Sequence, residues 1–244
     1  MQRYFIELSY NGAAYHGWQI QPNAHSIQEE IQSKISRLQS NAPVKVVGCG
    51  RTDTGVHAHH YILHVDLPPI SDTDLFLLKL NRMLPDSIAL SKIYPVADEM
   101  HARFGATART YRYFVHTQKD PFRADTSWYV SQKLDVAKMN EAAQLLLGTK
   151  DFTSLSKLHT DVKTNICDVR VARWVEVDAH SMYFEITADR FLRNMVRATV
   201  GTLMDVGLGK LSPADIPKIL AAMDRQAAST SVPAHALFLW KIEY

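Results

Sequence analysis

The sequence predicts an α+β fold built from two halves that share the element order βαββαβ. Three observations support this prediction: strands in which apolar residues alternate, helices that begin at capping residues, and the return of the same element order after residue 100. Such halves form antiparallel sheets with helices on one face, the ferredoxin-like plan, and leave a cleft between them. We expect the halves to span residues 1–100 and 101–244.

The first half begins with an alternating strand, in which Tyr4, Ile6 and Leu8 lie on one face. Ser26 and Glu29 then form a capping box, which is a common start of a helix. The predicted elements are, in order, a strand over 3–10, a helix over 27–38, strands over 44–49 and 57–67, a helix from Asp72 to Met83 ended by Pro85, and a strand over 88–96.

The second half repeats this order and adds a helix. Asp135 provides a helix cap, Gly148 a helix stop, and Pro213 suits the first turn of the additional helix. The predicted elements are, in order, a strand over 106–117, a helix from Asp135 to Gly148, strands over 167–177 and 182–187, a helix over 190–206, the additional helix over 212–223 and a closing strand over 238–244.

Length and composition indicate a globular protein with a sizeable core. The chain has 244 residues, 46% of them apolar, and a net charge of +2, so a nucleic-acid partner has to be recognised from local clusters of charge. No apolar stretch is long enough to cross a bilayer. Cys49 and Cys167 lie far apart and the first residues lack the apolar run of a signal peptide, so we expect a reducing cytoplasm.

Residues 50–58 read Gly-Arg-Thr-Asp-Thr-Gly-Val-His-Ala and form the loop between two predicted strands. The two glycines favour a tight turn whose backbone can approach a ligand, and Asp53 is presented between them. If Arg51 points to the same side, it keeps the carboxylate ionised and ready to act as a nucleophile or base. The alternative is an Asx-type turn in which Asp53 bonds to its own backbone.

A basic and aromatic stretch lies between His101 and Arg123. Alternation along the predicted strand places Arg109, Tyr111 and Tyr113 on one face, where they suit stacked bases and phosphates. The alternative is that the two tyrosines are ordinary core residues. The charged residues of the stretch include Arg103, Arg109, Arg112, Lys119 and Arg123, opposed by Asp120, and one of its aromatic residues is Phe104.

The predicted helix over 190–206 carries three arginines in a narrow arc, opposite a broad apolar face. They are Arg190, Arg193 and Arg197. No carboxylate lies four residues after any of them, so the arc suits an external anion. That anion is either RNA phosphate or a buried carboxylate such as Asp53. The alternative is an ordinary solvated helix face.

Histidines gather on the strand that follows the Asp53 loop. His57 and His59 share a strand face and, with Asp53, resemble part of a metal site, so a metallohydrolase is a rival enzyme class. His60 and His64 point to the other face. We therefore favour polar strand histidines and expect no bound metal.

Residues 50–57 look like the catalytic motif of the tRNA pseudouridine synthase A family. Further stretches resemble that family's motifs in the same order along nearly the whole chain. They are residues 8–19, 81–85, 101–113, 151–154 and 191–197. Because the motifs are specific when taken together, the chain is identified as similar to this family throughout.

The resemblance implies roles for particular residues. Asp53 matches the essential aspartate, Tyr111 the aromatic ring that stacks on the target uracil, and Arg197 the arginine paired with Asp53. Arg51 resembles the motif arginine that helps to hold the displaced nucleotide. The residues then expected to bind RNA are Arg103, Arg109, Arg190 and Arg193.

The resemblance also implies a reaction and a substrate. The reaction is an isomerisation without a cofactor, in which the uracil N-glycosidic bond breaks, the base turns, and a carbon–carbon bond forms to the same ribose. The implied substrates are the uridines at positions 38 to 40 of the tRNA anticodon stem-loop, bound in a catalytic cleft between the halves of a homodimer subunit. The uridine has to leave its stack, at a cost of about a few kcal/mol that stacking and phosphate contacts offset.

Two questions stay open at the level of sequence. Asp53 can attack the ribose, add to the uracil ring or remove a ribose proton. A second protein class, an RNA-binding module without catalysis, also fits, because ferredoxin-like halves with basic clusters suit RNA recognition equally well. Asp53 separates the two classes, since a pure RNA binder gains nothing from a carboxylate that faces a polyanion.

Overall fold

The computed structural model describes residues 1–157 and 163–244 and divides into two units with dense internal contacts. The first unit comprises Met1–Thr107 and Phe238–Tyr244, and the second comprises Ala108–Leu237. The last strand of the chain therefore belongs with the N-terminal unit, whereas the predicted boundary at residue 100 placed it in the second half. The reason is that the last strand pairs in parallel with the strand that begins at His57, with Phe238 opposite His57.

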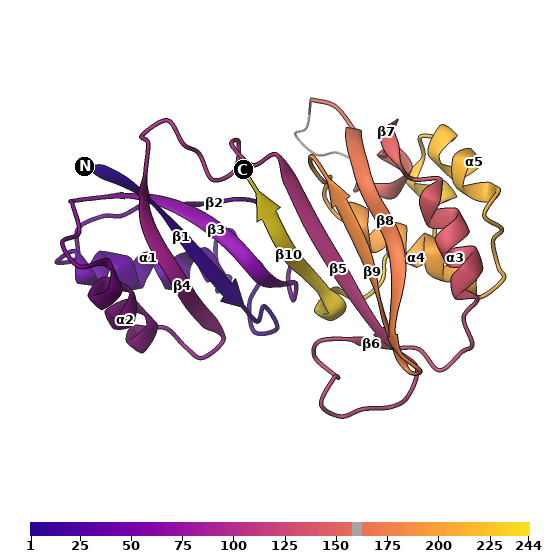
Figure 1. The fold of residues 1–244 in the computed structure, drawn as a ribbon, viewed down its shortest axis with the longest axis horizontal. Coiled ribbons are helices and arrows are strands. Elements are labelled where there is room, and N and C mark those ends of the chain that lie inside the picture. Colours follow the sequence, from indigo (N-terminus) through magenta and orange to yellow (C-terminus); the bar gives the residue numbers. More distant parts are fainter. Residues whose placement is uncertain (158–162) are drawn as a thin grey trace. The chain divides into compact units, whose positions relative to one another are not determined.

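The first unit is a sheet with two helices (Figure 1). Its elements are β1 (Gln2–Tyr10), α1 (Ile27–Leu38), β2 (Val46–Gly48), β3 (His57–Leu67), α2 (Thr73–Met83), β4 (Ile88–Val96) and β10 (Leu237–Glu243). The hydrogen-bonded order is β4-β1-β3-β10, with β2 also paired to β3. β1 is antiparallel to β3 and to β4. The long strand β3 pairs with β1 along one edge and with β10 and β2 along the other.

Side-chain caps set the helix starts of this unit where the sequence predicts them. The Ser26 hydroxyl accepts a hydrogen bond from the Glu29 amide, and the Asp72 carboxylate accepts one from the Leu75 amide at 2.8 Å. The buried residues of α1 recur every four positions, at Ile27, Ile31 and Ile35, which is the spacing of one helix face. Both helices of the first unit thus form as predicted.

The second unit is an antiparallel sheet in the order β5-β9-β8-β7, with β6 added in parallel to β5 (Figure 1). Its strands are β5 (Ala108–His116), β6 (Trp128–Tyr129), β7 (Gly148–Asp151), β8 (Ile166–Asp178) and β9 (Ser181–Ala188). Its helices are α3 (Val136–Gln144), α4 (Met195–Gly207) and α5 (Asp215–Ala221), with the 3-10 turns η1 (Thr153–Leu155), η2 (Arg225–Ala227) and η3 (Ala234–Ala236). The sequence missed β6 and β7, which are too short to show alternation.

Helix α4 starts at Met195, five residues later than predicted. Asn194 has a left-handed backbone with φ 66°, and the Asp189 carboxylate accepts a hydrogen bond from the Arg190 amide at 2.7 Å, so the chain before Met195 is a turn. Arg190 and Arg193 therefore lie outside the helix. The prediction of three arginines on one helix face was wrong.

The two tyrosines of β5 that were predicted to share a groove differ in burial. Tyr113 is fully buried, its hydroxyl donates to the Pro233 carbonyl at 3.0 Å, and burial raises its pKa. Tyr113 is thus a core residue, in line with the alternative interpretation. Tyr111 is half-buried. The α+β class is confirmed, and no helix of the described residues is long and apolar enough to span a bilayer.

Glu185 on the central strand β9 is bound by arginines from both neighbouring strands. Arg112 of β5 donates to one carboxylate oxygen at 2.8 Å, and Arg173 of β8 donates to the other at 2.7 Å. Burial opposes ionisation of Glu185, but the hydrogen bonds from Arg173 and Arg112 outweigh it, so the pKa of Glu185 lies below its ordinary value. The charged carboxylate therefore stabilises the sheet.

The Glu185→Gln variant should be less stable at pH 7 by about 1 to 3 kcal/mol, because the hydrogen bonds from Arg112 and Arg173 lose the charge of the carboxylate. Because the pKa of Glu185 is lower in the folded state than in the unfolded state, the ionised carboxylate stabilises the fold at pH values above the unfolded-state pKa. This contribution disappears as the pH falls through the folded-state pKa. Urea denaturation at pH 7 and at acidic pH should therefore show a difference between variant and wild type that narrows in acid. Glu243→Gln, in an exposed ion pair with Lys241, is the control, and equal losses in both variants would contradict the assignment.

Candidate active site

Asp53 lies on the loop between β2 and β3, and the prediction that this loop joins two strands is confirmed. Asp53 is half-buried and Arg51 is exposed. The Trp18 amide donates to the Thr52 carbonyl at 3.2 Å, and the Val56 amide donates to the Asp53 carbonyl at 3.1 Å. The backbone on both sides of the Asp53 side chain is therefore fixed by hydrogen bonds.

Two buried tyrosines hold the same loop through their hydroxyl groups. Tyr61 of β3 donates to the Gly50 carbonyl at 2.6 Å, and the hydroxyls of Tyr10 and Thr52 hydrogen-bond at 2.8 Å. The Tyr61 ring stacks on Trp18 with ring centroids 4.2 Å apart, which fixes the position of the hydroxyl. The strands beneath the loop thus position residues 50 and 52, directly before Asp53.

Gly17 lets the segment before α1 reach this loop. Its φ is +89°, in the region that side chains avoid, and a Cβ atom at Gly17 would lie 2.4 Å from the Thr52 carbonyl oxygen. Only glycine combines this conformation with this approach. Two of the sequence stretches that carry the family resemblance, around Gly17 and around Asp53, therefore pack directly on each other.

In the second unit, Tyr111 lies beside the turn that precedes α4. Its ring meets the Phe191 ring edge to face, with centroids 5.0 Å apart and planes at 85°. Arg109 donates to the Asp189 carbonyl at 2.8 Å. The structure therefore brings Tyr111 and Arg109 together with the turn that contains Arg190 and Arg193.

Arg197 occupies the first turn of α4 and is tied to the segment before η3. Its Nε donates to the Val232 carbonyl at 2.8 Å, and the Val232 amide donates to the Arg197 carbonyl at 3.3 Å. This reciprocal pair fixes both the backbone and the direction of the side chain. The apolar periodicity of the helix does not predict these two hydrogen bonds between Arg197 and Val232.

The histidines of β3 have packing and hydrogen-bonding roles. His57 is buried, accepts a hydrogen bond from the Gly12 amide at 3.1 Å and stacks on Phe238 at 4.5 Å. His59 stacks on Trp240 at 4.0 Å. Among residues 1–157 and 163–244, no three His, Cys, Asp or Glu side chains are grouped as metal ligands. These contacts account for the paired histidines that suggested a metallohydrolase.

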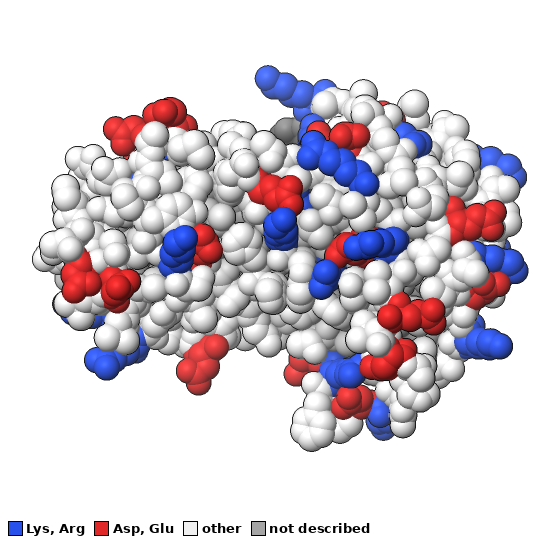
Figure 2. Space-filling model, in the orientation of Figure 1, with Lys and Arg blue, Asp and Glu red and all other residues white. Residues whose placement is uncertain are grey.

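On the face drawn in Figure 2, charge does not form a single basic field. Figure 2 shows Lys and Arg side chains interspersed with Asp and Glu on the face turned to the viewer. Arg103 lies on the segment between β4 and β5, where the adjacent Ala102 amide donates to His64 of β3 at 3.1 Å. His64 is seven residues beyond His57. The structure therefore places Arg103 at the opposite end of β3 from the Asp53 loop.

Comparisons with known proteins agree along the whole chain. The tRNA pseudouridine synthase A of Parabacteroides distasonis is 51% identical over 245 residues, which cover 100% of this chain and 96% of that protein. The chain belongs to the tRNA pseudouridine synthase A family. The tRNA pseudouridine synthase A of Bacteroides fragilis is also 51% identical, covering 100% of this chain and 97% of that protein, and that of Bacillus subtilis is 39% identical, covering 97% of each.

The family model described as tRNA pseudouridine synthase matches residues 142–244. Among solved structures, a Thermus thermophilus Cse3 bound to RNA aligns with 85% of this chain and 97% of that chain, but a TM-score of 0.26 at 12% identity carries no argument. Family membership thus rests on the relatives. In this member of the tRNA pseudouridine synthase A family, the sequence did not predict the contacts of Tyr10 and Tyr61 with the Asp53 loop. The one sequence signal for these contacts is that both residues carry a hydroxyl group at a buried strand position, where an apolar side chain would also fit.

Proposed function

We propose that the chain isomerises uridine to pseudouridine at positions 38 to 40 in the anticodon stem-loop of tRNA. The observation that carries the proposal is Asp53 on a loop held in place by buried hydroxyls, in a chain 51% identical over its full length to a tRNA pseudouridine synthase A. The pattern of motifs along the sequence supports the same substrate. A metallohydrolase has no comparable support.

The chemistry follows from the two isomers. The bond between uracil N1 and ribose C1′ breaks, the base turns and a bond forms between C5 and C1′. The C5 hydrogen leaves to solvent as a proton, and N1 takes up a proton, so the product is an isomer of uridine. The reaction has no net redox change, so the proposal includes no cofactor. A positioned carboxylate and a site that excludes water from the detached base are what the protein has to provide.

Asp53 is proposed as the carboxylate that acts on the nucleotide, with Arg51 holding the displaced uridine. Tyr111 is proposed to stack on the target uracil, and Arg197 to be the cationic partner of Asp53 in the reaction. Within the second unit, the contact of Tyr111 with Phe191 and the hydrogen bond from Arg197 to the Val232 carbonyl hold both side chains in place. The residues proposed to bind RNA phosphate are Arg103, Arg109, Arg190 and Arg193.

The remaining parts of the proposal concern architecture and context. The element order of the first unit, β1-α1-β2-β3-α2-β4, supports a ferredoxin-like arrangement of that unit. The proposal includes a second ferredoxin-like half and a catalytic cleft between the halves. The proposal also includes a homodimer and a cytoplasmic location. The thiols of Cys49 and Cys167 are buried and unbridged, and burial raises the pKa of Cys167 to about 12, which suits a reducing compartment.

The assay uses an unmodified tRNA transcript that carries tritium at C5 of its uridines. Because C5 loses its hydrogen when it bonds to C1′, pseudouridine formation releases tritium to water in proportion to turnover. Sequencing by a pseudouridine-specific adduct then locates the modified positions. Tritium release with modification at positions 38 to 40 is expected, whereas tight binding of the transcript without release would support the RNA-binding module instead.

The Tyr111→Ala variant should lose about 5- to 150-fold in kcat/KM, because base stacking on an aromatic ring contributes this much. Tyr111→Phe keeps the ring and should stay close to wild type. The tritium-release assay measures both variants under conditions in which substrate is below KM. Equal losses in the two variants would contradict stacking and assign the effect to the hydroxyl.

The Tyr61→Phe variant should lower kcat by about tenfold, because the loop before Asp53 loses its hydrogen bond at Gly50 while the ring packing stays. Its stability should fall by about 1 kcal/mol. Tyr4→Phe is the matched control, since the Tyr4 hydroxyl accepts a hydrogen bond from Ile70 in the same unit but away from the loop. A similar loss of kcat in Tyr4→Phe would show that the Tyr61 effect is only structural.

A further inference from the structure

Phe104 is an exposed aromatic ring on the segment between β4 and β5. It is 77% exposed, whereas Phe5 and Phe184 are buried in the core. An exposed ring on a mobile tip would need no explanation, because single apolar residues are common on protein surfaces. The segment that carries Phe104 is, however, held to the first unit by a set of polar contacts.

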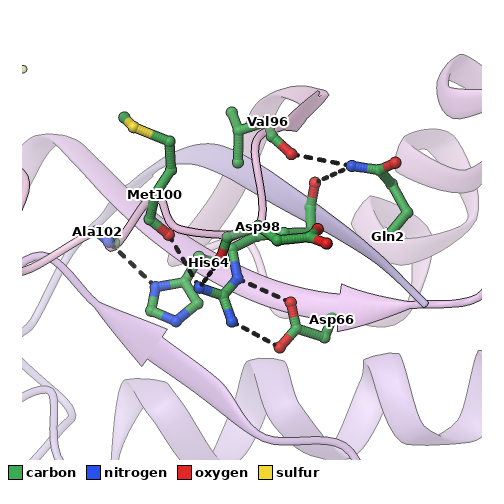
Figure 3. A network of polar contacts seen from close by, with 8 residues as sticks. Gln2, His64, Asp66, Val96, Asp98, Met100 and Ala102 are labelled. Atoms are coloured by element: carbon green, nitrogen blue, oxygen red, sulfur yellow. Dashed lines mark hydrogen bonds and ion pairs between the residues drawn. The ribbon is translucent and has the colours of Figure 1, made fainter.

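Figure 3 shows the first part of this network. Arg3 binds the Asp66 carboxylate with two parallel hydrogen bonds of 2.8 and 2.9 Å, which fixes the plane of its guanidinium group. The same group donates to the carbonyls of Asp98 at 2.6 Å and Met100 at 3.1 Å. The carbonyls of the connecting segment are thus fixed to β1 and β3.

Ala102 is held through both of its backbone groups. Its amide donates to Nδ1 of His64 at 3.1 Å, and its carbonyl accepts a hydrogen bond from the Tyr244 hydroxyl at 2.6 Å. Burial and the nearby charge of Arg3 lower the pKa of His64 to about 4, so its ring stays neutral and keeps Nδ1 as an acceptor near neutral pH. The segment is therefore anchored two residues before Phe104.

The turn itself is closed by His101. Its Nδ1 accepts hydrogen bonds from the amides of Arg103 at 3.1 Å and Phe104 at 3.2 Å, and its carbonyl accepts one from Gly105 at 2.8 Å. The His101 ring lies between the rings of His64 and Phe104, at centroid distances of 4.6 and 4.5 Å. One side of Phe104 is thus supported by a ring, while most of its surface is open.

The charge beside this ring points to its partner. The Arg103 guanidinium lies over the Phe104 ring, 5.5 Å from its centroid, so an exposed aromatic ring and a cation are presented together. Unpaired nucleobases stack on such rings while their phosphates bind the cation. We propose that Phe104 stacks on an unpaired base of the tRNA substrate, an inference that rests on the proposed function.

The position of Phe104 separates this contact from the chemistry. His64 is seven residues along β3 from His57, which at the rise of a strand corresponds to about 23 Å from the end that carries the Asp53 loop. A base bound there is not the target uridine. The contact contributes equally to the ground state and the transition state, so its loss raises KM and Kd and leaves kcat unchanged.

The first experiment compares variants in the tritium-release assay and in equilibrium binding of the unmodified tRNA transcript. Phe104→Ala should raise KM and Kd by about 5- to 150-fold at unchanged kcat. Phe104→Trp should bind like wild type, and Phe104→Leu, which is apolar but not aromatic, should bind like Phe104→Ala. Phe122→Ala is the matched control, because Phe122 is 94% exposed but lies on a different segment, between β5 and β6.

The second experiment uses Phe104→Trp as a probe. Addition of the transcript, or of a single-stranded oligoadenylate, should quench the fluorescence of the new indole, whereas Phe122→Trp should not respond. The inference would be overturned by unchanged KM and Kd in Phe104→Ala, or by equal binding of the transcript to Phe104→Leu and Phe104→Trp. A change in the sedimentation mass of Phe104→Ala would also overturn it, because Phe104 would then contact a second copy of the chain. If wild type makes no pseudouridine but binds the transcript through Phe104, the proposed function fails and the stacking site stands.

Discussion

Replacing Asp53 with alanine is expected to abolish pseudouridine formation, by on the order of 10⁴-fold or more in kcat, while tRNA affinity stays nearly unchanged. The structure gives the reason for this split. Asp53 is half-buried on a loop whose backbone is fixed by Trp18 and Tyr61, and Tyr10 holds the Thr52 side chain, so the Asp53 side chain can be removed without releasing the loop. Affinity for RNA depends on cations, and a carboxylate contributes nothing favourable to it.

Tritium release and equilibrium binding of the same transcript measure the two quantities separately. Asp53→Asn keeps the shape of the side chain and should be as inactive as Asp53→Ala, because the charge and basicity are lost in both. Asp86→Ala, on the exposed loop between α2 and β4, is the control and should be fully active. Retained turnover in Asp53→Ala would rule out the proposed mechanism, and a parallel loss of binding and turnover would assign Asp53 a structural role.

Local chemistry explains which elements the sequence could predict. The starts of α1, α2 and α3 follow from Ser26, Asp72 and Asp135, because a cap is a contact between neighbouring residues. The start of α4 depends on the left-handed backbone of Asn194, a conformation that apolar periodicity cannot detect. The pairing of β10 with β3 joins residues far apart in the sequence, so no local pattern could assign that strand to the first unit.

In the candidate site, too, local sequence patterns predict some features, whereas others depend on contacts between residues far apart in the sequence. The position of Asp53 on a loop between strands follows from the β-branched run over 44–49, the predicted strand over 57–67 and the glycines between them. What holds the loop does not, since Tyr10 and Tyr61 lie on strands whose alternation predicts only burial. The basic strand and helix were overestimated for a related reason: charge alone does not say that Arg109 donates to the Asp189 carbonyl, or that Arg190 leaves the helix.

Replacing Gly17 with alanine is expected to damage both stability and turnover. Its φ of +89° alone costs a side chain about 1 to 2 kcal/mol, and a Cβ 2.4 Å from the Thr52 carbonyl oxygen cannot be accommodated without moving main chain, so we expect a total loss of about 2 to 4 kcal/mol. The displaced carbonyl belongs to the residue directly before Asp53. A shift of the carboxylate by about 1 Å should lower kcat by about 100-fold.

A second glycine separates the two causes. The φ of Gly209 is +73°, but a Cβ atom added there would have no atom of the described residues within 4 Å, so Gly209→Ala carries the backbone cost without the steric one. Urea denaturation should show a smaller loss of stability in Gly209→Ala than in Gly17→Ala, and tritium release should show full kcat in Gly209→Ala. If Gly17→Ala also kept full kcat, the close approach of the two sequence stretches would not position Asp53. The hydrogen bond that Tyr61 donates to the Gly50 carbonyl would then suffice, because it reaches the loop from β3 and not through Gly17.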